Sequence, residues 1–252
     1  MTEISYAMVL FLAQMAVGLS IYGGFLSQKV FSKGFFETLM ILIAIQWTLV
    51  GIIVGFGKSY SLGFAIISMM GWLQFRKGGM LWGKMILSFV AGIGLVKGLV
   101  PMIRIPAGLS SSFQFSVFGV YFLGALLLAG AVLVFLLHRV CVGDVDGIDL
   151  ARENALKMLL AMVAVEGIYV LSVFYTLFRS SFSQVFHFHQ LTDSFLGFYG
   201  ALIAIAVLYL TVFFLAWSSI QMNSKSRISS FNSLIAAGMA VFVELLSFWM
   251  FL

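Results

Sequence analysis

Charged side chains are scarce in this chain, and their scarcity indicates which class of protein it belongs to. They make up 9% of the 252 residues, whereas hydrophobic residues make up 62%. A soluble domain carries roughly 25% charged residues, so the composition excludes an ordinary soluble domain and indicates a polytopic membrane protein. The net charge of +5 therefore does not point to nucleic acid, and the informative property is where the 14 Lys and Arg residues fall.

Cysteine and the common catalytic motifs are also nearly absent. Cys141 is the only cysteine, which excludes an intrachain disulfide and a metal site built from cysteines. The sequence contains no Walker A loop, no G-x-S-x-G and no H-E-x-x-H. We therefore expect no soluble-enzyme chemistry in this chain.

Only two prolines are present, and both lie in one short segment. Residues 100–112 read VPMIRIPAGLSSS, with Arg104 between Pro101 and Pro106. Apolar runs of membrane length flank this segment on both sides. We therefore predict that it is a connection at a membrane surface.

Long apolar runs make up most of the remaining sequence. A transmembrane helix needs about 20 apolar residues, and its backbone must be hydrogen-bonded internally. We predict an all-α, polytopic transmembrane helix bundle that forms a single integral-membrane domain over residues 1–252. Its eight runs are 4–26, 35–57, 59–75, 80–100, 113–137, 156–178, 196–220 and 231–252. The run 59–75 is short enough to be re-entrant, which would leave seven spans.

The distribution of basic residues favours eight spans over seven. With eight spans, ten Lys and Arg residues fall on one side and four on the other, namely Lys58, Lys97, Arg104 and Arg179. With seven, the division becomes nine against five. Because Lys and Arg concentrate on the cytoplasmic side, we predict eight spans with both termini outside, and the double-proline segment outside as well.

Two acidic residues lie well inside the predicted spans. Glu166 falls near the middle of the run 156–178, and Glu244 lies about two helical turns from the outer end of the last run. Charged groups inside a membrane are costly and are candidates for function by default. Each could be a protonated or hydrogen-bonded carboxyl that holds the bundle together, or a proton-linked carboxyl that faces a quinone.

The three histidines do not form a pattern typical of a cofactor site. His138 lies at the inner end of one run, and His187 and His189 lie in the outer loop 179–194. A haem held between spans needs two histidines that face each other inside the membrane, so we expect no haem. The H-x-H pair lacks a third ligand, so we predict no metal site and interpret the loop as a surface for lipid headgroups or a partner.

Three stretches resemble the membrane-anchor subunits of dimethyl sulfoxide reductase and related molybdenum enzymes, the DmsC-like family. Gln14, Ala16 and Gly18 match a family Q-x-A-x-G pattern in the first span. Residues 81–130 match successive spans of the family through L-W, R-I-P-A and F-L-G-A-L-L-L-A-G. Glu244 opens a C-terminal stretch that falls on the family's E-x-x-G-R-x-x-F-Y.

This resemblance implies a function in anaerobic respiration and electron transport. It implies eight spans with both termini outside, in the bacterial inner (cytoplasmic) membrane. The chain would hold an iron–sulfur subunit and a molybdenum catalytic subunit on the membrane, and would exchange electrons with menaquinone or another quinone. The iron–sulfur clusters and the molybdenum cofactor would belong to the partner subunits alone.

The sequence departs from the family where the family oxidises quinol. The family's long outer loop between spans two and three, with its histidine and its acidic group, is reduced here to GFGKSYSLGF around Lys58. We therefore predict a rebuilt quinol site at Lys58, Lys97, Arg104 and Glu244. The alternatives are a membrane scaffold that has lost quinol chemistry, or a small transporter.

Docking of the partner subunits is predicted on the outer connections. The segment 100–112 and the loop 179–194 are the main outer surfaces that the predicted topology leaves. The residues predicted to dock partners are Arg104, Pro106, Arg179, His187 and His189.

Overall fold

The computed structural model describes residues 3–27, 30–55, 60–103, 111–139, 148–179, 195–221 and 227–251. Within these ranges the chain forms eight long helices and two short irregular ones. In order they are α1 Glu3–Phe25, α2 Lys33–Val54, α3 Ser61–Arg76, α4 Met80–Ile93, the π-helix η2 Gly94–Leu99, the 3-10 helix η3 Val100–Met102, α5 Ser111–Arg139, α6 Ile148–Arg179, α8 Phe195–Gln221 and α9 Arg227–Phe251. The predicted all-helical fold is confirmed for the described residues.

Six helical segments of the described chain are long and apolar enough to cross a membrane. The other two long helices are not among these six segments. Helix α3 has 16 residues, and the apolar part of α9 is Phe231–Leu246. The prediction of a multi-pass membrane protein is therefore confirmed at this coarser level.

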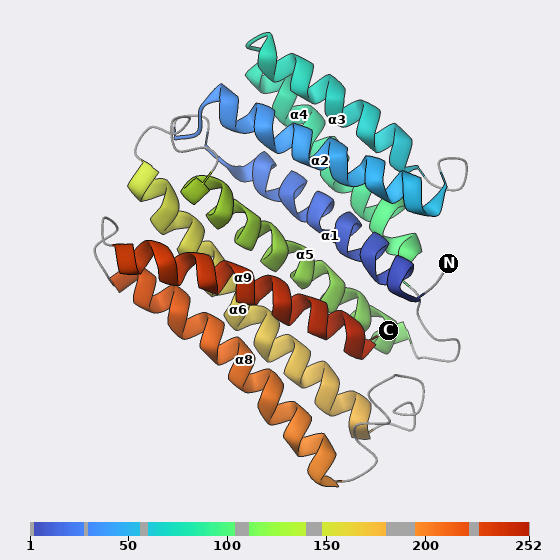
Figure 1. The fold of residues 1–252 in the computed structure, drawn as a ribbon. Coiled ribbons are helices and arrows are strands. Elements are labelled where there is room, and N and C mark those ends of the chain that lie inside the picture. Colours follow the sequence, from blue (N-terminus) through green and yellow to red (C-terminus); the bar gives the residue numbers. More distant parts are fainter. Residues whose placement is uncertain are drawn as a thin grey trace.

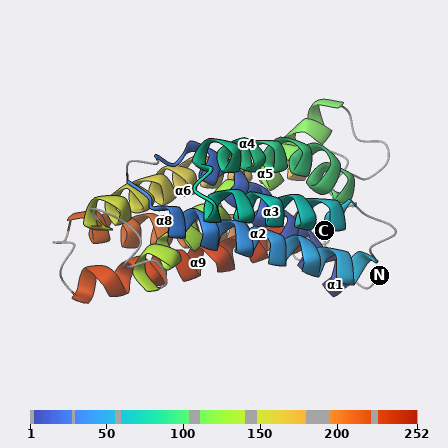
Figure 2. The same ribbon diagram turned by 90° about the horizontal axis from the view of Figure 1, so that it is seen from above.

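Successive long helices run in opposite directions, so their ends gather at two ends of one bundle (Figure 1). Helix α1 begins and α9 ends at the same end, which we call the terminal end. We call the other end of the bundle the opposite end. Figure 2, seen from above, shows the same placement of the two chain termini.

The bundle consists of two four-helix halves with the same order of contacts. In the first half, each of α1, α2 and α3 packs on the next helix, and α4 packs back on α1. In the second half, α5, α6, α8 and α9 make the same closed ring, with α9 back on α5. The main contact between the halves joins α1 to α5, the first helix of each.

Small residues let α1 and α5 approach closely. A Cβ atom added at Gly18 would overlap the backbone carbonyl of Ala125 and lie 2.9 Å from Cβ of Ala129. Ala125 and Ala129 are themselves fully buried. Without a hydrophobic force between helices in lipid, such close packing is a main source of helix association.

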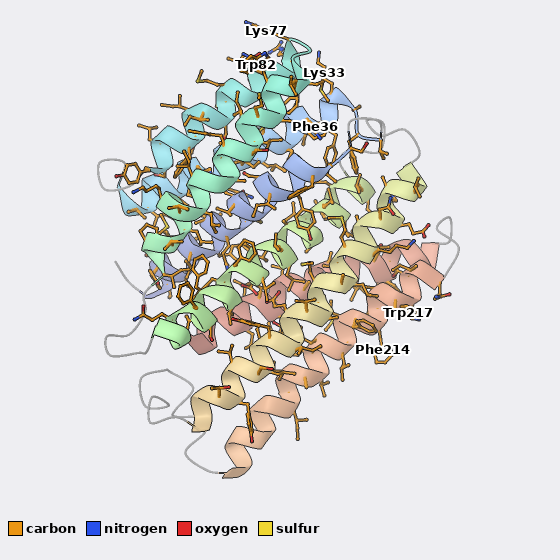
Figure 3. All side chains as sticks on the ribbon, turned by 180° about the vertical axis from the view of Figure 1, so that it is seen from behind. Lys33, Phe36, Lys77, Trp82, Phe214 and Trp217 are labelled. Atoms are coloured by element: carbon orange, nitrogen blue, oxygen red, sulfur yellow. The ribbon has the colours of Figure 1, made fainter. Side chains whose placement is uncertain are left out.

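Large apolar side chains cover the outside of the bundle. Trp82, Phe214 and Trp217 are 64%, 63% and 48% exposed, and Figure 3 shows them at the edges of the bundle, pointing away from it. Phe36, labelled in the same view, is fully buried. A surface of this kind suits contact with lipid, because exposing apolar side chains to lipid carries no free-energy penalty.

Lysines bind the carbonyl ends of two helices at the opposite end. Lys33 donates from Nζ to the backbone oxygen of Arg76, the last residue of α3, at 2.7 Å. Lys84 donates to the backbone oxygen of Leu26, just after α1, and its Nζ lies 5.6 Å from the ring centre of Phe36. Cations near a helix C-terminus satisfy free carbonyls and oppose the helix dipole.

We predict that Gly18→Ala destabilises the protein, because the new methyl group would meet the α5 backbone, which cannot move aside. The expected loss is about 1–3 kcal/mol, the usual cost of overpacking. Thermal unfolding in mild detergent, followed by circular dichroism, measures it. The control is Gly92→Ala on α4, where no atom lies within 4 Å of the added Cβ. Equal midpoints for the two variants would contradict the proposed role of the α1–α5 contact.

Candidate functional site

Two glutamates face each other in the interior of the second half. Glu166 on α6 and Glu244 on α9 are 0% and 1% exposed. Their carboxyl groups lie close enough to interact electrostatically. The two residues singled out from the sequence as intramembrane acids therefore belong to one site.

Side chains from two further helices hold this carboxyl pair. The Tyr209 hydroxyl on α8 donates to Oε1 of Glu166 at 3.1 Å. Gln14 on α1 donates from Nε2 to Oε1 of Glu244 at 3.2 Å, and to the backbone oxygen of Tyr121 on α5 at 2.6 Å. Five helices from both halves thus contribute to one buried polar cluster.

Two glycines make room for the cluster. A Cβ atom added at Gly124 on α5 would lie 2.6 Å from Oε2 of Glu244. A Cβ added at Gly167 on α6 would lie 3.0 Å from the ring of Tyr209. The absence of side chains at these positions lets the carboxyl and the phenol reach the interior of the bundle.

Each carboxyl of the pair has one oxygen without a hydrogen-bond partner in the described part of the chain. One oxygen of each carboxyl, Oε2, has no hydrogen-bond partner among the described residues, and the same holds for Oε1 of Gln14. Two adjacent carboxylates in an apolar interior cannot both carry charge, so at least one proton is needed. A proton on one carboxyl could hydrogen-bond to the other carboxyl, so the pair can hold a proton inside the bundle.

Of the four predicted quinol-binding residues, Lys97 and Glu244 lie within the described residues. Lys97 is an exposed residue of η2, which packs against α1 and α4 in the first half. Glu244 is buried among α5, α6 and α9 in the second half. Lys58 and Arg104 lie outside the described residues.

Most of the predicted docking residues also lie outside the described part of the chain. This applies to Arg104, Pro106, His187 and His189, and to the side chain of Arg179, which ends α6. The remaining histidine, His138, is near the opposite end, where its Nε2 lies 3.0 Å from the Ser233 hydroxyl. In the described residues no group of three or more His, Cys, Asp or Glu side chains is placed to hold a metal ion.

Sequence reasoning missed the roles of Gln14 and Tyr209. Gln14 had a detectable signal, since it is an amide in the middle of an apolar run and is fully buried in the structure. Tyr209 had none, because its phenol is ordinary in an apolar helix. Its role follows only from the packing of α8 against α6.

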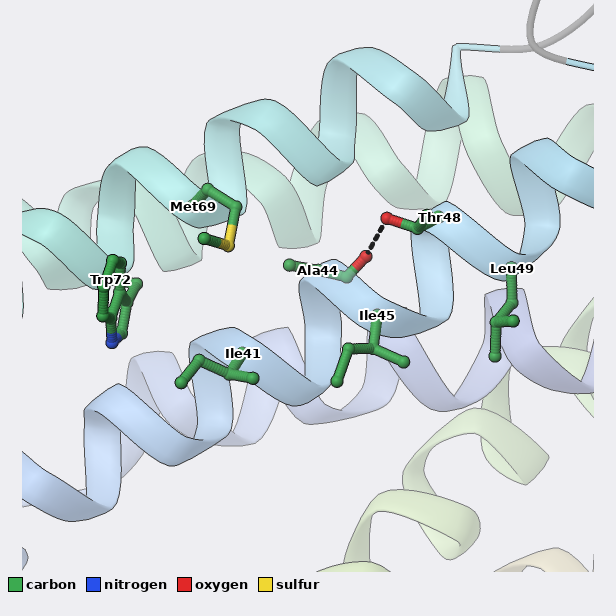
Figure 4. Close-up of a pocket in the computed structure, with 7 residues that line it drawn as sticks. All are labelled: Ile41, Ala44, Ile45, Thr48, Leu49, Met69 and Trp72. Carbon is green, nitrogen blue, oxygen red and sulfur yellow. Dashed lines mark hydrogen bonds between the residues drawn. The ribbon is translucent and has the colours of Figure 1, made fainter.

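An apolar groove lies on the lipid-facing side of the first half, between α2 and α3 (Figure 4). Its volume is about 480 Å³, and the Thr48 hydroxyl in its wall donates to the Ala44 carbonyl at 2.8 Å. No acid or base is among the lining residues, which are Ile41, Ala44, Ile45, Thr48, Leu49, Met69 and Trp72. The groove is apolar, and none of these lining residues offers an acid or base that could exchange protons with a quinone.

The π-helix η2 packs against a buried tryptophan of the first half. A Cβ added at Gly94 would lie 3.3 Å from the Trp47 ring, and one added at Gly98 would overlap it. The Trp47 ring also lies 4.7 Å from the ring of Phe64 on α3. The glycines of η2 thus serve packing inside the bundle.

Comparison with protein-family models, with curated proteins and with solved structures found no match to this chain. The functional argument therefore rests on the residues and contacts of the chain itself.

Proposed function

We propose that the protein is the membrane-anchor subunit of a respiratory molybdenum/iron–sulfur oxidoreductase and exchanges electrons with the quinone pool. The observation that carries the proposal is the buried pair of Glu166 and Glu244. Oxidation of a hydroquinone releases two protons with its two electrons, and an apolar protein needs nearby groups to accept them. The carboxyl pair supplies such groups inside the bundle.

The partners in this proposal supply the redox centres. An iron–sulfur subunit would receive the electrons, and a molybdenum catalytic subunit would use them. The quinone, menaquinone or a related one, would be held near the terminal end, where Lys97 and the predicted residues Lys58 and Arg104 fall in the sequence. The resemblance of the stretches around Gln14 and Glu244 to the anchor family supports this assignment, because both residues belong to the carboxyl cluster.

In the proposed topology all eight long helices cross the bacterial inner membrane, with the terminal end outside. Helix α3, at about 1.5 Å per residue, is about 24 Å long and runs beside α2, which supports a crossing rather than a re-entrant segment (Figure 1). Basic residues near the opposite end include Lys33, Arg76 and Lys84, which supports a cytoplasmic location.

We predict that a reporter fused after Lys77, which follows α3 at the opposite end, reads as cytoplasmic, because basic connections stay on that side. Paired alkaline phosphatase and fluorescent-protein fusions measure this. A fusion after Lys33, at the start of α2, should read the same way, since both positions lie at one end of the bundle. An external reading after Lys77 would overturn the eight-span orientation.

A proton-coupled transporter is the second candidate. The two halves of the bundle have the same order of helix contacts, and the acidic site lies where α1 of the first half meets the second half. Transporters often place their coupling sites at the interface between such repeats, which favours this candidate. Uptake of a solute that is driven by a proton gradient, into vesicles that contain this protein alone, would support the transporter hypothesis. The same result would argue against the assignment as a membrane-anchor subunit.

We predict that Glu244→Gln slows electron transfer from quinol by about 10²–10⁴-fold, the usual contribution of a positioned proton-transfer group. The complex is purified in mild detergent, and reduction of its iron–sulfur clusters by a quinol analogue is followed by electron paramagnetic resonance. The matched control is Glu37→Gln on α2, in the other half of the bundle, whose carboxyl pairs with Lys33 at 3.8 Å.

Three results of this experiment separate the hypotheses. An iron–sulfur protein that co-purifies, with slow reduction only in Glu244→Gln, supports the proposal. A co-purified partner whose clusters are not reduced by quinol in any variant indicates a scaffold without redox function. If no iron–sulfur protein co-purifies, the anchor assignment is wrong.

A further inference from the structure

A pocket of about 370 Å³ opens at the opposite end of the bundle, where the two halves meet. One wall is the end of α1 with the start of the connection to α2, and it includes Leu26, Val30 and Phe31. The other wall is the start of α6, with Met158, and Leu133 of α5 also lines the pocket. Figure 1 shows the start of α6 beside the connection between α1 and α2.

The lining of this pocket is mostly apolar, but one wall carries a cation. Its polar residues are Ser27, Asn154 and Lys157, and no acid is among the described lining residues. Asn154 and Lys157 are three residues apart on α6, so they lie on one face of the helix, and both are exposed. The groove between α2 and α3 has no charged residue in its wall, so the lysine distinguishes this pocket from it.

The pocket lies at the depth where lipid headgroups meet acyl chains. Leu26 ends the first predicted apolar run, 4–26, and Lys157 is the second residue of the run 156–178. Helix α6 has 32 residues and is about 48 Å long at about 1.5 Å per residue, whereas the hydrocarbon core of a bilayer is about 30 Å thick. The first turns of α6 can therefore lie among the headgroups, with Lys157 at their boundary with the acyl chains.

Lys157 can bind a phosphate although it already has a partner. Its Nζ lies 2.6 Å from Oε1 of Glu153, which is one helical turn earlier on α6. The two side chains are 56% and 43% exposed, and exposed ion pairs of this kind are weak. A lysine ammonium has three N–H donors, so Lys157 can keep its contact with Glu153 and donate to a phosphate at the same time.

The charge on this side of the chain favours an anion. In the predicted topology the side of the opposite end carries ten Lys and Arg residues and five Asp and Glu residues. Basic pockets between transmembrane helices on the cytoplasmic side bind the headgroups of anionic lipids. A zwitterionic lipid also has a phosphate, but it places a positive group beside it, which an excess of basic residues disfavours.

We propose that this pocket binds one anionic phospholipid from the leaflet at the opposite end. The Lys157 ammonium and the Asn154 amide donate to the lipid phosphate. An acyl chain lies against the apolar wall that includes Leu26, Val30 and Met158. Because the walls come from both halves of the bundle, the bound lipid holds the halves together and stabilises the protein. The site depends neither on a quinone nor on partner subunits.

The test measures lipid binding to the full chain, purified in mild detergent and freed of its native lipid. Dioleoylphosphatidylglycerol is the anionic probe, and dioleoylphosphatidylcholine, with the same acyl chains, is the zwitterionic control. Native mass spectrometry gives the dissociation constant for the first bound molecule of each lipid. The anionic lipid should bind about fivefold more tightly, which is the contribution expected from one lysine near an anionic headgroup. It should also raise the thermal unfolding midpoint by more than the control lipid does.

Lys157→Gln should remove this preference, because it lowers the affinity for the anionic lipid about fivefold and leaves that for the zwitterionic lipid unchanged. The matched control is Lys77→Gln. Lys77 is an exposed lysine that follows α3 at the same end and does not line the pocket, so this variant should bind both lipids like the wild type. Glu153→Gln, which removes the carboxylate that shares Lys157, should bind the anionic lipid at least as tightly as the wild type.

A photoreactive phosphatidylglycerol locates the bound molecule. With a diazirine group in its acyl chain, the lipid should label peptides from the end of α1 or from the first three turns of α6, which form the two walls. The same peptides of Lys157→Gln should carry about fivefold less label at a lipid concentration below the dissociation constant.

Three outcomes would overturn the site. Equal affinity of the wild type for the two lipids shows that the pocket does not select an anion. Equal weakening in Lys157→Gln and Lys77→Gln shows a general attraction to the basic end of the bundle. Label confined to other helices shows that the lipid binds elsewhere. None of these outcomes bears on whether an iron–sulfur partner co-purifies.

Discussion

Gln14 lies at the contact on which the two halves of the bundle depend. Its amide donates to the Tyr121 backbone on α5 and to Glu244 on α9, so a single side chain of the first half binds two helices of the second. Burying a polar group without a partner is costly, and the lipid surrounding the bundle offers none. Gln14 can donate to Glu244 only while the halves stay together, and separation of α1 from α5 would leave this carboxyl without that donor.

The small residues around this contact follow from the same constraint. Gly18 allows α1 to approach the α5 backbone, and Gly124 leaves space for the Glu244 carboxyl between α5 and α9. Larger side chains at either position would push apart the helices that the hydrogen bonds join.

The sequence predicted the helices well, because the length and apolarity of a run are local properties. The expected run 4–26 corresponds to α1 Glu3–Phe25, and the short run 59–75 to α3 Ser61–Arg76. It also identified Glu166 and Glu244 as unusual. It could not show that they meet, because their contact depends on how α6 and α9 pack. Nor could it find Tyr209, whose role depends on the packing of α8 against α6.

The most direct test of this account is a double-mutant cycle on Gln14 and Glu244. The free energy of unfolding in mild detergent is measured for Gln14→Leu, Glu244→Leu and the double variant. If the amide and the carboxyl hold the halves together, the two losses are not additive, and the coupling energy is about 1–3 kcal/mol. A coupling energy within about 0.5 kcal/mol of zero would show that the two residues act independently, and would contradict the account.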